Sequence, residues 1–247
     1  HTFSFDRERF SPLVFVLPIM ENANLETIDQ MLGKMQGEEA YEALSKMERT
    51  SDVEWRLASA IYYITLDIDD QKERREKLIE GFELAKSAFE KDPKNNETAK
   101  QAALLAGFLS ESATKTLEKM KYGAEFKKYL DHTIELEPEP GMAVLHMRGR
   151  FSFTVASMSW LERTMAYKVF DSLPTCTYDD ALKDLLAAEK IYPTLTTLLF
   201  IGKAYLGKGD HEKAREYLTR ASNCKGKEKW AIDEEQIEEA KKILAEL

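Results

Sequence analysis

The chain has 247 residues with 32% charged and 10% aromatic side chains, a composition that excludes both a disordered tail and a membrane-embedded protein. Its net charge of −9 excludes nucleic acid as a partner of the surface as a whole, because phosphate groups would be repelled. The 11 Gly and 7 Pro favour long helices over strands, and Cys176 and Cys224 have neither metal-ligand nor redox-pair spacing, which suits a reducing cytosol.

We interpret residues 1–20 as an N-terminal extension and residues 21–247 as one helical domain. Leu13 to Met20 is apolar but far shorter than the roughly 20 residues that a bilayer-spanning helix needs, so we expect no transmembrane segment in this chain. This segment either packs onto the body of the protein or contacts a membrane or a partner. Because the first residue is His1 rather than Met, both an anchored and an unanchored parent protein are compatible with this start.

Apolar residues at helical spacing predict two short helices after the extension, over residues 25–35 and 40–47. Ser51 and Asp52 offer a cap for a third helix. That helix carries the spacing of the first helix of a repeat, at Trp55, Ser59 and Tyr62. The charged stretch from Asp67 to Lys77 is predicted to be a connection.

A pattern of three mostly small or apolar residues followed by a proline occurs three times, at offsets of four, seven and twelve residues. Proline cannot continue a helix, so each occurrence is expected to end the second helix of a hairpin. Such a repeat is typical of tetratricopeptide proteins. The clear occurrences are Gly81, Ala85, Ala88, Pro93 and Ala181, Leu185, Ala188, Pro193; the weaker one is Phe126, Leu130, Thr133, Pro138.

The best-formed repeat runs from Tyr178 to Ala221. Gly202 and Ala214 are predicted to lie where its two helices cross, because a larger side chain there would push the helices apart. Tyr205 and Leu218 fill the space beside them. Gly209 is expected to end the first helix and Asp210 to cap the second.

Two first helices are predicted to be unusually long, at Asn96–Lys119 and Met142–Phe170, and Asp233–Leu247 is predicted to be a C-terminal capping helix. We therefore predict an all-α fold of about ten or eleven helices, with tetratricopeptide-like antiparallel hairpins stacked into a superhelix and no sheet. In the second long helix, Trp160 is expected to pack inward. Arg163, three residues on, is expected to reach a carboxylate or carbonyl near the following hairpin.

No catalytic or metal-binding pattern emerges. The four histidines have no partner four residues away, and no phosphate-binding or dinucleotide-binding glycine motif occurs. We therefore expect no enzyme activity, no catalytic residue, no metal and no cofactor.

Two kinds of surface are candidate binding sites. First helices line the groove of such an array, which places seven residues there: Arg56, Tyr63, His146, Arg150, Phe153, Leu199 and Lys203. A basic patch, defined as Lys208, Lys213, Arg215, Arg220 and Lys225, offers contact with an acidic protein or lipid surface, and a second lysine-rich stretch runs from Lys115 to Lys128. The alternative is that all of these residues lie on ordinary helix faces that contact only solvent.

With these motifs in view, the chain resembles the regulator of microtubule dynamics family over residues 39–247. The resemblance rests on four stretches and their order, the last of which leads into Ala181 and Ala188. They are Trp55-Arg56-Leu57-Ala58, Arg148-Gly149-Arg150-Phe151, Ser159-Trp160-Leu161-Glu162-Arg163 and Thr177-Tyr178, with Leu199 to Tyr205 and Gly209-Asp210 following.

The resemblance implies a non-enzymatic cytoplasmic protein that associates with tubulin and microtubules, at the spindle and spindle poles, and supports chromosome segregation. Some members carry an N-terminal membrane anchor and act at organelle contacts, with a lipid-binding role proposed for the helical domain. Lipid binding or transfer is therefore one alternative, and a generic peptide-binding adaptor is another. The helix from Met142, rich in Met and Phe, could roof a lipid cavity, although such a stripe also suits a packed core.

Overall fold

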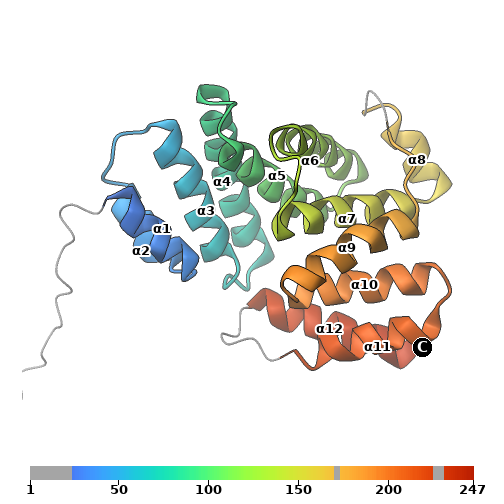
Figure 1. Ribbon diagram of the computed structural model, residues 1–247. Coiled ribbons are helices and arrows are strands. Elements are labelled where there is room, and N and C mark those ends of the chain that lie inside the picture. Colours follow the sequence, from blue (N-terminus) through green and yellow to red (C-terminus); the bar gives the residue numbers. More distant parts are fainter. Residues whose placement is uncertain (1–23, 170–172, 225–230) are drawn as a thin grey trace, which may run out of the picture.

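The computed structural model describes residues 24–169, 173–224 and 231–247, and every element in these ranges is a helix. The described ranges contain twelve helices, one or two more than expected, and the all-α class is confirmed (Figure 1). The proposed extension, residues 1–20, lies outside the described residues. None of the helices in the described ranges is both long and apolar enough to cross a bilayer.

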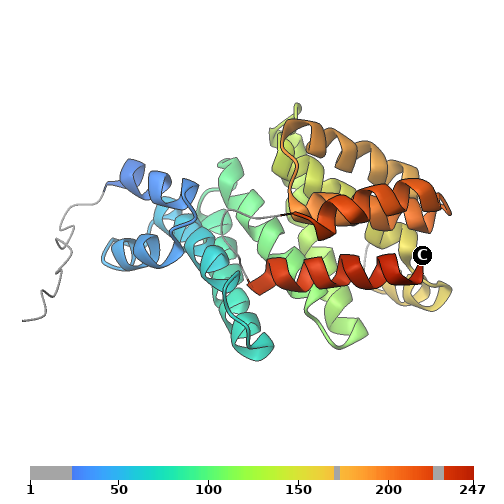
Figure 2. The ribbon, with the colours of Figure 1, turned by 90° about the horizontal axis from the view of Figure 1, so that it is seen from below.

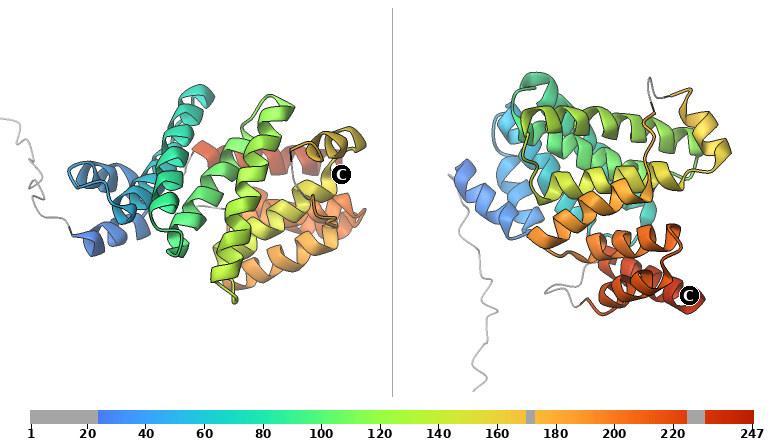
Figure 3. Two further views of the ribbon diagram at one scale, coloured as in Figure 1. Left: turned by 90° about the horizontal axis from the view of Figure 1, so that it is seen from above. Right: turned by 45° about the vertical axis from the view of Figure 1, so that its right-hand side comes forward.

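Four antiparallel helix pairs, each in mutual contact, stack side by side as a tetratricopeptide-like array (Figures 1 and 3). They are preceded by a short pair, interrupted by α8 and followed by α12. In order, the bounds are α1 Leu25–Gly33, α2 Gly37–Leu44, α3 Ser51–Thr65, α4 Gln71–Lys91, α5 Asn96–Glu111, α6 Thr116–Leu136, α7 Met142–Ser157, α8 Trp160–Ala166, α9 Tyr178–Ile191, α10 Leu195–Gly207, α11 His211–Ser222 and α12 Ala231–Glu246. The stacked pairs are α3 with α4, α5 with α6, α7 with α9, and α10 with α11.

The small residues singled out by the sequence lie at the helix crossings. A Cβ atom at Gly202 would come within 2.6 Å of Leu218 Cγ, and one at Gly149 within 2.7 Å of Leu185 Cγ. Ala181, Ala188 and Ala214 are fully buried against the paired helices. These close approaches confirm that the small residues set the distance between the helices of each pair.

The predicted helix ends are also confirmed in the last pair. Gly209 has φ of +80°, a left-handed conformation that glycine adopts without a Cβ penalty, and it comes directly after Lys208, the C-cap of α10. Asp210 caps α11, its side chain accepting a hydrogen bond from the Lys213 amide. The exposed Pro193 follows the end of α9, as the pattern required.

Three predicted spans were wrong. The helix expected over Asn96–Lys119 breaks after Glu111, and the one expected over Met142–Phe170 breaks after Ser157. The second break has a clear cause, because Met158 is extended and Ser159 starts α8 with a capping box to Glu162. The predicted connection from Asp67 to Lys77 is also shorter than expected, because Asp70 caps α4, which begins at Gln71.

Trp160 is not buried, contrary to the prediction, and its side chain is 81% exposed. It is the first residue of α8, where the capping box turns the chain away from the body. Arg163 does reach a carbonyl, but that carbonyl belongs to Val155 of the preceding helix, 2.8 Å from Nη2. Arg163 therefore fastens α8 to the end of α7 rather than to the following hairpin.

The C-terminal helix α12 does more than cover the last hairpin. It packs on α11 and α10, and its first turn returns to the first stacked pair (Figure 2). There the Ile232 amide donates to the Leu66 carbonyl at 3.2 Å, and Arg74 forms two hydrogen bonds of 2.9 Å with Glu235. Helix α12 thus spans the concave side of the array and joins its two ends.

Candidate functional site

The concave side holds a cavity of about 410 Å³. Its walls come from α5, α6, α7 and α10, and α12 contributes Gln236 and Glu239 at its rim. Most of the lining is apolar, with Met120, Met147, Met158 and several phenylalanines. The volume lies in the range of pockets that take a small organic ligand.

Five of the seven predicted groove residues line this cavity: His146, Arg150, Phe153, Leu199 and Lys203. Three come from α7 and two from α10, the first helices of adjacent pairs. The array therefore brings these five side chains together as the repeat geometry indicated, and their role in binding stays a prediction.

Phe200 of α10 is the centre of a row of alternating cations and rings. The Arg150 guanidinium lies 4.5 Å from the Phe200 ring centroid, and the Lys203 ammonium lies 4.8 Å from the same centroid. The Phe153 ring meets Phe200 edge to face at 5.4 Å, and Arg150 also lies 5.7 Å from the Phe108 ring. Such cation–π contacts hold both cations against apolar surface.

Both cations are neutralised by carboxylates from other helices. Arg150 pairs with Glu111 of α5, and Lys203 pairs with Glu239 of α12 at 2.6 Å. The cavity therefore presents aromatic surface and compensated charge, rather than an uncompensated positive site. A ligand group that engages either cation must compete with a carboxylate.

His146 is an uncharged structural contact in the cavity wall. Its Nδ1 lies 2.9 Å from Oγ1 of the buried Thr197, which links α7 to α10. Burial, together with the charge of Arg150, lowers the pKa of His146 to about 3. The imidazole is therefore neutral at physiological pH and does not act as an acid–base switch there.

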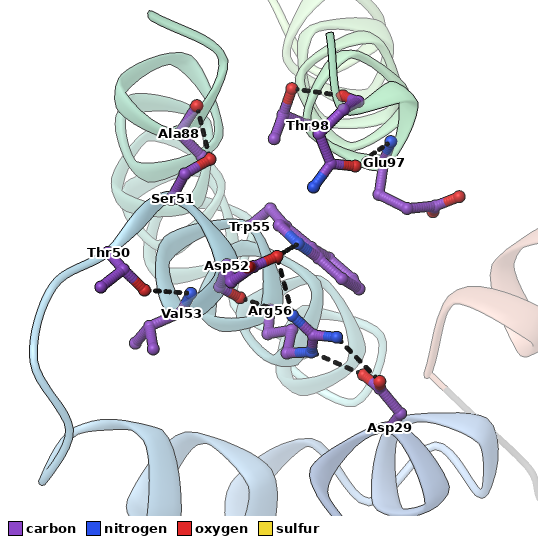
Figure 4. A network of polar contacts seen from close by, with 11 residues as sticks. Asp29, Thr50, Ser51, Asp52, Val53, Trp55, Arg56, Ala88, Glu97 and Thr98 are labelled. Carbon is purple, nitrogen blue, oxygen red and sulfur yellow. Dashed lines mark hydrogen bonds and ion pairs between the residues drawn. The ribbon is translucent and has the colours of Figure 1, made fainter. Parts of the chain in front are cut away.

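Arg56 and Tyr63, the other two predicted groove residues, do not line the cavity. Arg56 of α3 makes a two-point ion pair with Asp29 of α1, at 2.6 and 2.8 Å (Figure 4). Burial lowers the pKa of Arg56, but its bonds to Asp29 and Asp52 outweigh this and raise the pKa above its ordinary value. Tyr63 faces α2, where a Cβ at Gly37 would lie 3.0 Å from its own Cβ.

Trp55 supports the same N-terminal junction. Its indole N–H donates to Asp52 at 3.3 Å, and the Arg56 guanidinium lies over its ring at 4.1 Å (Figure 4). Tyr178, at the start of α9, fills the space over Gly207, whose Cβ would come within 2.4 Å of the ring. Tyr205 stacks on Tyr217 with centroids 5.7 Å apart.

The predicted basic patch is divided by the structure. Lys208 pairs with Asp179 and Arg220 pairs with Glu189, each at 2.5 Å, and these bonds raise the pKa of both cations. Lys213 and Arg215 are exposed on α11, and within the described ranges no ion pair involves either. Lys225 lies outside the described residues.

Four residues of the site were missed: Phe108, Glu111, Phe200 and Glu239. Phe200 follows the predicted Leu199 directly, and its spacing of three residues from Lys203 was a usable signal for a cation–π pair. The carboxylates could not have been matched to their partners, since Glu111 is 39 residues from Arg150 and Glu239 is 36 from Lys203.

Among the residues that the structure describes, no cluster of His, Cys, Asp and Glu has the geometry to hold a metal ion. Stacked helix pairs around a concave, mainly apolar cavity define a helical-repeat protein of the tetratricopeptide type.

The family comparison is more specific. The model for "Regulator of microtubule dynamics protein 1-3" matches residues 24–247, and the chain belongs to this family. It is 36% identical to regulator of microtubule dynamics protein 1 of Caenorhabditis elegans over 175 residues, which cover 70% of this chain and 76% of that protein. It is 30% identical to protein 2 of Bos taurus over 78% of this chain, and 30% identical to protein 3 of Bos taurus over 94% of this chain.

The chain spans about half the length of the two bovine relatives, with 47% and 50% of them covered. Among solved structures, a thermophilic tetratricopeptide protein of Thermus thermophilus is similar at a TM-score of 0.49 and 14% identity, covering 87% of this chain and 91% of that one. The fold assignment rests on the helix pairs themselves rather than on this distant likeness.

Proposed function

We propose that this chain is a non-enzymatic, microtubule-associated interaction protein of the cytoplasm and cytoskeleton that supports spindle organisation and chromosome segregation. The observation that carries the proposal is membership of a family whose relatives are named regulators of microtubule dynamics, over the whole described body. A helical-repeat array suits this role, because it presents extended rigid surfaces to a protein partner.

The outer face of α11 is the proposed tubulin contact. The chain is net negative and tubulin is acidic, so approach is unfavourable unless a basic face is presented. Lys213 and Arg215 are the exposed members of the patch without an ion pair in the described structure, whereas Lys208 and Arg220 are already neutralised. At about 0.15 M salt the Debye length is about 8 Å, so binding should be weak and salt-sensitive.

Co-sedimentation with microtubules tests this proposal. The double variant Lys213→Glu/Arg215→Glu should lose binding while keeping its melting temperature, because neither residue packs in the core. A matched control, Lys72→Glu/Lys94→Glu, makes the same change in net charge at exposed positions of α4 and of the connection from α4 to α5. If both variants lost microtubule binding equally, net charge rather than the α11 face would determine binding. If both variants still bound, the α11 contact would be refuted.

Arg220 is left out of the charge reversal for a structural reason. Glu189, its partner, is only 18% exposed, so a glutamate at position 220 would place two carboxylates together and destabilise the fold at this ion pair between α9 and α11. The role at the spindle has a separate readout, since cells that carry the double variant should lose spindle localisation and missegregate chromosomes.

A second candidate function is the binding of an apolar ligand such as a lipid acyl chain. The observation that favours it is the 410 Å³ cavity lined by Met and Phe side chains. The stretch that begins at Met142, which the sequence suggested as a cover for such a cavity, contributes to its lining through α7.

Mass spectrometry of lipid extracted from the purified protein tests the second candidate. Thr154 lines the cavity, and Thr154→Trp should exclude a retained lipid, whereas Thr219→Trp on the exposed face of α11 should not. If neither the parent protein nor the Thr219→Trp variant carried lipid, this function would be excluded. Lipid retained equally in both variants would place it outside the cavity.

A further inference from the structure

The solvent face of α8 is apolar. Its three large exposed side chains are Trp160, Leu161 and Tyr167, exposed by 81, 60 and 59%. Thr164 and Lys168 are the other exposed residues from Trp160 to Val169, so this face has no acidic residue. We define the α8 patch as Trp160, Leu161, Tyr167 and Lys168. Three large apolar side chains are thus exposed within eight residues, two on the seven-residue helix α8 and the third at its C-cap, Tyr167; such exposure costs free energy in water and indicates an interaction surface.

The α8 patch is held rigidly on the body. The capping box between Ser159 and Glu162 fixes the start of α8, and the Arg163 guanidinium bonds to the Val155 carbonyl. The inner face packs through the buried Ala166 into a core cluster with Met120 and Val155. Exposure of the patch therefore results from a defined helix orientation, and Figure 1 shows α8 beyond the C-terminal end of α7, at the edge of the molecule.

Lysines flank the patch. Val169, two residues after Tyr167, lines a surface hollow together with Lys115, Leu117 and Lys121 of the α6 region. Within the described ranges no ion pair involves Lys115, Lys121 or Lys168, and Leu117 is itself 52% exposed.

Three acidic side chains beside this surface are already engaged. Glu118 pairs with Arg75 at 2.7 Å, and Glu125, which lines the same hollow, lies 3.9 Å from the Lys128 ammonium. Glu162 accepts the capping bonds of Ser159, which lower its pKa. The local charge is therefore positive on a chain whose net charge is −9.

We propose that the α8 patch docks this protein reversibly on the surface of an anionic lipid bilayer, an interaction that goes beyond the proposed microtubule role. Trp and Tyr side chains favour the headgroup region, where the ring is buried and the polar group stays hydrated. Leu161 and Leu117 add apolar area. The lysines are attracted to the negative surface of the bilayer. Insertion of apolar side chains and electrostatic attraction are the two contributions that stable but reversible membrane binding requires.

The size and shape of the patch favour a bilayer over a protein partner. A stable protein interface buries roughly 800 Å² on each side and contains a complementary pocket. Here three side chains stand on one short projecting helix, and a fluid bilayer surface accepts such a projection without a preformed pocket. A second copy of the chain would have to offer a matching recess.

Flotation with vesicles tests the proposal on the full chain. Binding to phosphatidylcholine vesicles with about 30% phosphatidylserine should exceed binding to pure phosphatidylcholine by at least about tenfold, from several flanking lysines. The variant Trp160→Ser/Leu161→Ser/Tyr167→Ser should reduce the partition coefficient at least about tenfold. The matched control Ile191→Ser/Tyr192→Ser removes side chains that are 59 and 64% exposed at the end of α9, and it should bind normally.

Two further measurements separate the contributions. Lys115→Glu/Lys121→Glu should weaken binding and flatten its salt dependence. Brominated lipid should quench tryptophan emission in the parent and not in Trp160→Phe, which retains the other two of the three tryptophans. Vesicle binding that survives the triple serine change would overturn the proposal. So would an absence of vesicle binding together with a dimer that the same change disperses, since the patch would then join two copies of the chain.

Discussion

Substitution of Gly202 by alanine tests the helix crossing on which the last hairpin depends. The added Cβ would lie 2.6 Å from Leu218 Cγ, 2.9 Å from its Cδ2 and 3.2 Å from its backbone nitrogen. Leu218 is fully buried and cannot rotate into open space, so α10 and α11 must separate. Overpacking of this kind costs about 1–3 kcal/mol, and the better helix propensity of alanine returns about 1 kcal/mol. The difference is about 0–2 kcal/mol, and the 2.6 Å approach places this substitution at the upper end, a net loss of about 2 kcal/mol.

Thermal unfolding followed by circular dichroism should show a fall in melting temperature of roughly 4–8 °C, at roughly 2–4 °C per kcal/mol for a chain of this size. Gly33→Ala is the matched control, because no heavy atom lies within 4 Å of the Cβ it adds. In a Leu218→Ala background the clash with Cγ and Cδ2 disappears, and Gly202→Ala should become neutral or stabilising. Equal destabilisation in both backgrounds would refute the steric argument.

Three more predictions follow from single contacts. When the pH falls from 6.5 to 5, the unfolding free energy of the parent should decrease by about 1–2 kcal/mol more than that of His146→Gln, as measured by urea denaturation. The reason is that the pKa of His146 in the folded state is about 3, so only the unfolded chain protonates this imidazole in that pH range. Parallel dependence of the two free energies on pH would contradict the prediction. Trp160→Ala should change stability by less than about 0.5 kcal/mol, since the ring is exposed, and a large drop in melting temperature would mean that it packs. Arg74→Ala should speed hydrogen exchange in the first turn of α12 but not in α5, and unchanged exchange would show that the Glu235 pair does not hold that turn.

The sequence was sufficient for features that depend on spacing along one helix. Gly202, Ala214 and Pro193 identify the last hairpin because small residues at a crossing and a proline after a helix have local causes. The cavity residues of α7 and α10 followed from the same register.

Features set by contacts between distant segments could not be predicted. The pair of Arg74 with Glu235 joins residues 161 apart, and nothing in either neighbourhood specifies it. The exposure of Trp160 was misjudged for a different reason, because aromatic content alone suggested a core. The capping box from Ser159 to Glu162 was readable in the sequence and marks the break that turns Trp160 outward.

Helix α12 also changes how the molecule can move. In an open repeat array each unit contacts only its neighbours, so the two ends can unfold independently and the superhelix can lengthen and shorten elastically. Here the last element is fastened to the first stacked pair by the Leu66 carbonyl and by Arg74. Stretching or twisting the array must therefore strain these contacts of α12. The concave side can open only after α12 has detached from the first stacked pair.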